Sequence, residues 1–145
     1  MGERDMMAVL IAERDSEWQG WVDTLRAVAD CVRVIAQRPN ESASAFAARV
    51  RSEMQRSTDA IDHAVLIGGL GCDPEVLAAR TLMVHALTSR MTDKSRLHLD
   101  GNRRTGLAME ALAQIVSDQL QASGVEVVTA ATESERSPSI VPLAA

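Results

Sequence analysis

The chain has 145 residues and a mass of 15.6 kDa, with 46% hydrophobic and 24% charged residues, a composition typical of one globular domain. A net charge of -5 and a pI near 5.2 argue against nucleic-acid binding, because the phosphate backbone is recognised by clustered lysine and arginine. No apolar stretch approaches the roughly 18 residues of a membrane span. The charged start MGERDMM lacks the pattern of a signal peptide, so we expect a cytoplasmic protein that binds no membrane.

The first third of the chain predicts a strand, a helix and a second strand. The apolar run 8–12 (AVLIA) is typical of a strand buried on both faces. Ser16 followed by Gln19 has the spacing of a capping box, which predicts a helix that starts there. Its inward residues are expected to be Trp18, Val22, Leu25 and Val28. Residues 31–37 (CVRVIAQ) alternate in polarity, so this strand should meet water on one face or edge.

The middle of the chain predicts a helix, a strand and a further helix. Asn40 or Ser42 can cap a helix that runs to about residue 57, with an apolar stripe of Phe46, Ala47, Val50 and Met54. Residues 64–67 form the next expected strand. Asp73 before Pro74 then predicts a capped helix over 74–91, whose positive first turn also carries Glu75.

The last part of the chain predicts a strand at 96–100, a helix at 105–122 and a strand at 125–128. The helix is expected to turn Leu107, Ala111, Leu112, Ile115, Val116 and Leu120 inward, and Gly124 suits the position after its end. Residues 133–145 mix serine, proline and charge without a regular period, which favours a flexible tail. We therefore assign one domain to residues 1–132.

Five strands separated by four helices predict an α/β fold, a single doubly wound parallel sheet with helices on both faces. The first and third strands are the most uniformly apolar and belong in the middle, whereas the second and fifth carry Arg33, Gln37 and Glu126 and resemble edges. This pattern favours the flavodoxin-like order 2-1-3-4-5. Ligands of such sheets bind beyond the carboxyl ends of the strands, where the winding reverses between strands one and three.

The candidate ligand-binding residues therefore come from the loops that follow these strands. Each is polar or a glycine at the expected carboxyl edge of the sheet. They are Glu13, Asp15 and Ser16 after the first strand, Gly68, Gly69 and Gly71 after the third, and Asp100 at the end of the fourth. Asp100 has an alternative role as a cap, with Asn102, of the following helix.

The glycine cluster has two interpretations. Its backbone N-H groups and the following helix N-terminus could hold a phosphate. However, Asp73 and Glu75 already place negative charge at that helix end, and glycine is also the default residue of a tight turn. The cluster lacks both a Walker Lys-Ser/Thr and a full G-x-G-x-x-G, so the tight-turn interpretation is favoured over the phosphate site.

The stretches IAERDSE and HAVLIGGLG resemble the two ATP-loop regions of universal stress proteins. Gly68 and Gly71 match the G-x-x-G of that family, and Asp15 with Ser16 matches its acidic-x-Ser segment loosely. The resemblance implies a small domain that binds ATP or a related nucleotide. It is partial, because Arg80 and Thr81 stand where the family has a phosphate-binding Gly-Ser or Gly-Thr.

Other chemistries are disfavoured by particular residues. A receiver domain would need an aspartate at the end of strand three, where this chain has Gly68 and Gly69. The acidic loop after strand one is unsuited to flavin phosphate, so no flavin is expected. Cys72 precedes a helix but has Asp73 beside it and no nearby cation, which disfavours a reactive thiolate.

No catalytic residues and no metal site are predicted. His63, His85 and His98 show no paired metal-ligand spacing, and Cys31 and Cys72 lie in unlike contexts, so we expect reduced thiols. The leading interpretation is a non-catalytic domain that binds a nucleotide or another phosphorylated small molecule. The alternative is a protein-interaction module, with homodimer formation through an exposed edge strand or helix face.

Overall fold

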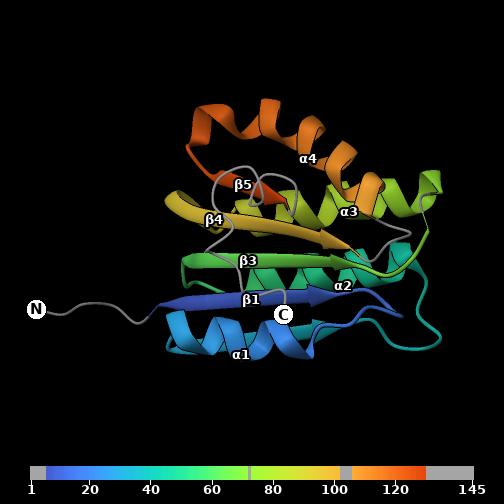
Figure 1. Ribbon diagram of the computed structural model, residues 1–145, viewed down its shortest axis with the longest axis horizontal. Coiled ribbons are helices and arrows are strands. Elements are labelled where there is room, and N and C mark those ends of the chain that lie inside the picture. The colour runs from blue at the N-terminus through green and yellow to red at the C-terminus, as the bar shows by residue number, and fades with distance from the viewer. Residues whose placement is uncertain (1–5, 72, 102–105, 130–145) are drawn as a thin grey trace, which may run out of the picture.

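The computed structural model describes residues 6–71, 73–101 and 106–129. Strands and helices alternate along the chain (Figure 1). The elements are β1 (Met7–Ala12), α1 (Gln19–Val28), β2 (Cys31–Ala36), α2 (Ala43–Arg56), β3 (Ile61–Gly68), α3 (Pro74–Thr88), β4 (Met91–Gly101), α4 (Gly106–Leu120), a 3-10 turn (Gln121–Ser123) and β5 (Glu126–Thr129). Residues 133–145, predicted to form a flexible tail, lie outside the described part of the chain.

The five strands form one parallel sheet in the order β2-β1-β3-β4-β5. The predicted fold class and strand order are both confirmed. The two uniformly apolar strands, β1 and β3, lie side by side, with Ala12 of β1 in register with Ile67 of β3. Because β1 connects toward one edge and β3 toward the other, their carboxyl ends lie where the winding reverses.

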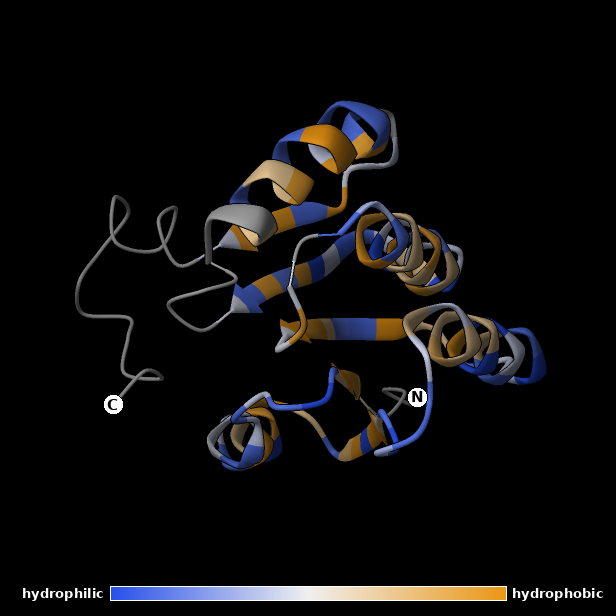
Figure 2. Cartoon of the chain, turned by 90° about the vertical axis from the view of Figure 1, so that its right-hand side faces the viewer, coloured by the Kyte–Doolittle hydropathy of each residue, from blue (hydrophilic) through white to orange (hydrophobic). Residues whose placement is uncertain are grey.

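The helices cover the two faces of the sheet unequally. Helices α2, α3 and α4 pack against one face and share a hydrophobic core with Val9, Leu66 and Leu97. Helix α1 lies on the opposite face, where Leu25 joins Leu10 and Val65 in a second, smaller core. Figure 2 looks onto the carboxyl edge and shows α1 alone on its side of the sheet.

The apolar stripe predicted for α2 is confirmed. The start of α2 also agrees with one of the two N-cap residues that the sequence predicted. Its side chains Phe46, Ala47, Val50 and Met54 are all buried. Ser42 is the N-cap, and its hydroxyl oxygen accepts a 3.1 Å hydrogen bond from the backbone N-H of Ala45. This bond satisfies one of the donors that a helix N-terminus leaves free, which fixes the start of α2.

The predicted start of α1 is wrong. The helix begins at Gln19 with Trp18 as its N-cap, and no side chain caps it. The hydroxyl of Ser16 instead donates a 2.6 Å hydrogen bond to the carbonyl of Glu13, which closes a turn after β1. Ser16 is therefore used by the turn and is not available to the helix. Of the predicted inward residues, Leu25 is buried and Val28 is exposed.

Several predicted element boundaries, and the predicted burial or exposure of two side chains, also differ from the structure. Helix α3 ends at Thr88 rather than 91, and β4 begins at Met91, five residues before its predicted start at 96. Gln37 is buried because its side chain bridges the loops after β1 and β2. Ile115, predicted to point inward, is 44% exposed, because Leu112, Val116 and Leu120 form the buried stripe of α4.

Candidate functional site

The loops after β1 and β3 contact each other directly at the carboxyl edge of the sheet. The backbone N-H of Glu13 donates to the carbonyl of Ile67 at 3.0 Å and extends the strand pairing by one residue. A Cβ on Gly69 would overlap the carbonyl oxygen of Arg14 and lie 2.7 Å from the backbone nitrogen of Ser16. A glycine is therefore required at position 69 for the two loops to pack.

Glu13 points inward from this junction and is 3% exposed. Its Oε1 accepts hydrogen bonds from the backbone N-H groups of Gly69 and Leu70, each at 3.0 Å. Charged acceptors strengthen such bonds, so the carboxylate holds the glycine loop against the end of β1. Glu13, Gly68 and Gly69 are thus brought together as predicted, but the acid serves as an internal anchor.

The partner of this carboxylate is Arg80, which reaches it from the second turn of α3. Arg80 Nε lies 2.7 Å from Glu13 Oε2, and Arg80 Nη2 lies 2.8 Å from Oε1. Arg80 Nη2 also donates to the carbonyl of Leu70 at 3.1 Å. The buried Nη1 has no hydrogen-bond partner among the described residues. The pair is fully removed from water, so its hydrogen bonds must offset a large cost of desolvation.

Arg80 was missed as a site residue by the sequence interpretation, which noted it as a departure from the universal stress pattern. The signal that could have identified it is an arginine in an otherwise apolar helical stretch, VLAARTLMV. A cation in such a stretch is expected to have an acidic partner, since unpaired charges are seldom buried.

The glycine cluster therefore does form an anion cradle, and the anion that it holds is Glu13. The N-H groups of Gly69 and Leu70 are the donors that a phosphate would otherwise use. Gly71 lies further out, and a Cβ there would meet nothing within 4 Å. Cys72 lies outside the described residues. Asp73 is the N-cap of α3, but its side chain makes no capping hydrogen bond.

Asp15 lies at the outer side of the same junction, with its side chain exposed. Its φ angle of 67° makes it the one non-glycine residue with positive φ in the described part of the chain. Aspartate tolerates this left-handed conformation better than most residues, yet the conformation still costs free energy. The strain is located where the loop turns away from Glu13 and toward α1.

Beyond this turn, the N-terminus of α1 carries uncapped N-H groups. The N-cap Trp18 offers no side-chain acceptor, and the first turn of α1 contains no acidic residue. Gly20, in that turn, would have nothing within 4 Å of an added Cβ. The backbone N-H of Trp21 donates to the carbonyl of Trp18 at 3.0 Å, which leaves the N-H groups of Gln19 and Gly20 without a side-chain cap. The helix dipole gives this end a partial positive charge.

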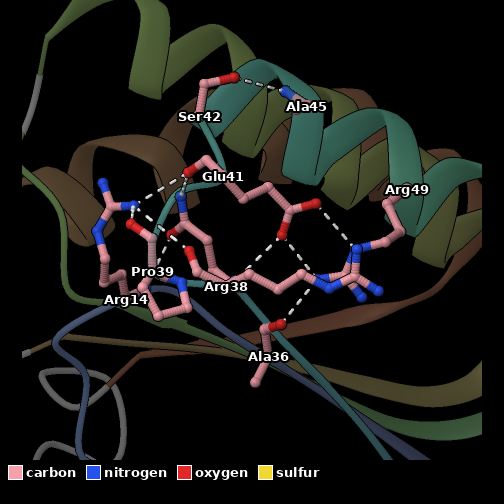
Figure 3. Close-up of polar contacts among 9 residues, drawn as sticks. Arg14, Ala36, Arg38, Pro39, Glu41, Ser42, Ala45 and Arg49 are labelled. Atoms are coloured by element: carbon pink, nitrogen blue, oxygen red, sulfur yellow. Dashed lines mark hydrogen bonds and ion pairs between the residues drawn. The ribbon is translucent and has the colours of Figure 1, made fainter.

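The loops after β1 and β2 are joined by Arg14. Its Nη1 donates to the carbonyl oxygens of Pro39 at 2.8 Å and Glu41 at 3.1 Å, as Figure 3 shows. Its backbone N-H donates to the side chain of Gln37 at 2.8 Å, and Gln37 donates in turn to the carbonyl of Glu41. These bonds fix the loop after β2 beside the end of β1.

Arg49 of α2 holds the far end of that loop. Its Nε lies 2.9 Å and its Nη2 2.7 Å from the two carboxylate oxygens of Glu41, and Nη2 also donates to the carbonyl of Ala36 (Figure 3). The hydrogen bonds from Arg49 lower the pKa of Glu41, and those to Glu41 raise the pKa of Arg49. The two-point geometry makes this pair more specific than an ordinary surface ion pair.

Asp100 ends β4 beside β3, in register with Ile67. Its Oδ2 accepts a 2.7 Å hydrogen bond from the indole N-H of Trp21, and its Oδ1 accepts one from the backbone N-H of Gly101. The ring of Trp21 also lies against His98, with 5.3 Å between centroids. Asp100 thus anchors α1 to β4, on the side of the sheet away from the Glu13–Arg80 pair.

Within residues 6–71, 73–101 and 106–129, no group of three or more histidine, cysteine, aspartate or glutamate side chains has the geometry of a metal site. In the same ranges, no helix is both long enough and apolar enough to span a membrane.

Comparisons with known proteins give one structural likeness. No protein-family model matches the chain, and no curated protein matches it. The fold is similar to a crystal structure of BdcA in complex with NADPH, with a TM-score of 0.61 and 10% sequence identity. The match covers 86% of this chain and 68% of the BdcA chain. At this identity the likeness supports an α/β, Rossmann-like fold and nothing finer.

Proposed function

We propose that this chain is a non-catalytic α/β domain that binds a nucleotide or another phosphorylated small molecule at the carboxyl ends of β1 and β3. The place is favoured because ligands of doubly wound sheets bind where the winding reverses. The partial resemblance to universal stress proteins, carried by Asp15, Ser16, Gly68 and Gly71, implies the same class of ligand, with ATP or a related nucleotide as its example.

The observation that carries the proposal is the uncapped N-terminus of α1. Its first turn has no side-chain cap and no acidic side chain, and its Gly20 is uncovered. A helix N-terminus that follows the first strand of such a sheet is a common phosphate site. The phosphate would bind here because Glu13 already occupies the inner cradle at Gly69 and Leu70.

The neighbouring polar groups suit the rest of a nucleotide. The exposed carboxylate of Asp15 can accept hydrogen bonds from sugar hydroxyls. In dinucleotide sites an acidic residue that lies later in the chain has this role. BdcA, solved with NADPH, supports a nucleotide as the ligand class by analogy of fold. In the described residues of these loops, no hydroxyl contacts an imidazole or a free carboxylate, so we assign binding without turnover.

The test is a thermal-shift and calorimetric panel of adenine and guanine nucleotides, NADPH and inorganic phosphate against the full chain. A ligand at 100 times its Kd stabilises the folded state by about 2.7 kcal/mol. Gly20→Asp places a carboxylate at the first turn of α1, where it should stabilise the helix by roughly 0.3–1 kcal/mol and repel phosphate. Gly20→Ala is the matched control.

We expect a nucleotide to raise the melting temperature of the wild-type chain and of Gly20→Ala, and to have no effect on Gly20→Asp. A Gly20→Asp variant that folds normally and binds as tightly as Gly20→Ala would overturn the placement of the phosphate. A panel in which no nucleotide or phosphate shifts the melt would overturn the function itself.

A second candidate function, protein interaction through an edge of the sheet, is favoured by β2. This strand forms one edge, and its Val34 and Cys31 are exposed. Exposed edge strands pair readily with other chains, including a second copy in a homodimer. Light scattering of the wild type and of Val34→Lys tests this, because a charge on the edge should dissociate a β2-paired dimer.

A further inference from the structure

The outer side of α3 lacks the charges of an ordinary surface helix. Within residues 76–89 the one lysine, arginine, aspartate or glutamate is Arg80, which is buried against Glu13. The exposed positions of this stretch hold aliphatic, hydroxyl and histidine side chains, and Leu77 and Leu82 are 37% and 36% exposed. A surface helix turns charged and polar residues to solvent, whereas a helix that is apolar on all sides is covered. The outer side of α3 therefore has the composition of an interface.

A groove of about 350 Å³ lies between α3 and α2. Met54 of α2, with Leu82 and Ala86 of α3, forms its apolar lining. Its polar lining includes Arg51 of α2 and His85 of α3. Arg51 is exposed and has no hydrogen bond or ion pair with the part of the chain that the structure describes. An apolar hollow beside an unpaired cation is complementary to an apolar side chain that has a carboxylate near it.

Helix α4 carries this combination on its own outer side. Ile115 is 44% exposed, and Asp118, three residues further on, is exposed on the neighbouring part of the same helix surface. Asp118 likewise makes no ion pair with any described residue. These side chains cannot reach the groove of their own chain, because α3 lies between α4 and α2 (Figure 1). They are therefore available to the groove of a second copy.

The groove and the α4 residues lie at the same height along the helices. His85 lines the groove together with Arg51. Its Nε2 lies 2.8 Å from Oε1 of Gln119, which adjoins Asp118 in α4. A two-fold axis parallel to α3 preserves this height and exchanges the α2 side of one copy with the α4 side of the other. Such an axis brings Asp118 of each copy opposite Arg51 of the other.

We propose that the outer surface of α2, α3 and α4 is a homodimer interface, in which Ile115 of each copy enters the groove of the other and Asp118 pairs with Arg51. Ile115 lies one turn before Asp118 and so meets the end of the groove that Leu82 lines. The surface is self-complementary, as a two-fold interface requires, because each copy supplies both the entering side chain and the groove.

The size of this surface suits a dimer that depends on concentration. Helix α3 has 15 residues and is therefore about 22 Å long. Three helices side by side span about 28 Å, since neighbouring axes lie about 8–10 Å apart. Each copy would then bury on the order of 600 Å², which is the lower end of the range for specific interfaces. We therefore expect a reversible dimer rather than a permanent one.

The test is sedimentation velocity of the full chain over a concentration series from the micromolar to the millimolar range. We expect the wild type to dimerise reversibly as the concentration rises. Arg51→Asp and Asp118→Arg each place two pairs of like charges across the interface, so each variant alone should dimerise at least about tenfold more weakly. An equimolar mixture of the two variants restores opposite charges at both contacts and should recover the dimer. Recovery in the mixture also shows that both variants are folded.

Matched controls separate this surface from the others. Arg56→Asp makes the same charge change on the side of α2 that pairs with Glu53, and Val34→Lys adds a charge at the β2 edge. Both variants should dimerise as the wild type does, whereas Ile115→Asp should weaken the dimer at least about tenfold, because it buries an unpaired charge. The proposal is overturned by a wild type that stays monomeric or by a mixture that fails to associate. It is also overturned by a dimer that Val34→Lys dissociates and the α2 and α4 variants do not.

Discussion

The carboxylate of Glu13 and the guanidinium of Arg80 form a two-point ion pair at 2.7 and 2.8 Å, with each side chain only 1% exposed. The pair links the end of β1 to the second turn of α3, and through Leu70 and Gly69 it also holds the loop after β3. The end of β1, the second turn of α3 and the loop after β3 are thus all held together by one buried acid. The pair fixes the inner wall of the candidate site.

Loss of the charge on Glu13 should be strongly destabilising. Glu13→Gln leaves the Arg80 cation buried without an opposite charge, so we expect the free energy of unfolding to fall by about 3–5 kcal/mol. Urea unfolding measures the change. The control is Glu13→Gln combined with Arg80→Met, which removes both charges and should recover part of the loss. A double variant as unstable as the sum of the two single variants would contradict a coupled pair.

The glycines should differ sharply in their tolerance of a methyl group. At Gly69 an added Cβ would overlap the backbone of the 14–16 loop, so Gly69→Ala should destabilise by about 1–3 kcal/mol or more. At Gly71 nothing lies within 4 Å, and Gly71→Ala should change stability by less than about 0.5 kcal/mol. Thermal melts of both variants test this. Equal losses at the two positions would show that the loops do not pack as described.

The strand order and the meeting of the two loops could be predicted from the sequence because they depend on patterns that are local in each strand. The uniform apolar character of β1 and β3 requires cover on both faces, which only central strands have, and adjacent central strands bring their loops together. The alternation of polar and apolar residues in β2 predicted an edge strand, because such a strand meets water on one side. The buried stripe of α2 followed from its helical period.

The role of Glu13 could not be predicted, since its partner lies on α3, far away in the sequence. An acid after a strand has the same local pattern whether it faces a ligand or an internal arginine. The predicted start of α1 was wrong for a related reason. The Ser16 hydroxyl could bond either the helix N-H groups or the carbonyl of Glu13, and it bonds the carbonyl. Both errors arise where tertiary contacts decide between local alternatives.

Arg49 should control the titration of Glu41. Hydrogen bonds from Arg49 lower the pKa of Glu41, so Arg49→Met should raise that pKa toward its usual value near 4.5. The pair stabilises the fold above the pKa of the unfolded chain and loses its effect as the pH falls through the folded value. We expect a loss of about 1 kcal/mol at pH 7 that shrinks below pH 4. Carboxyl NMR titration tests this, with the exposed Arg51→Met as a control that should leave Glu41 unchanged.

His98 should make the protein less stable as the pH falls from about 6.5 to about 4. Burial lowers the pKa of His98 to about 4, with smaller contributions from His63 and Arg96. Between the folded and unfolded pKa values the unfolded chain binds more protons, so the free energy of unfolding decreases with falling pH, by up to about 1.4 kcal/mol per unit. Urea unfolding at several pH values measures the slope. His98→Asn should reduce the slope, and the parts due to His63, whose pKa burial also lowers, and to Glu41 near pH 4 should remain. A slope that is the same in His98→Asn and the wild type would show that His98 is not buried as a neutral ring.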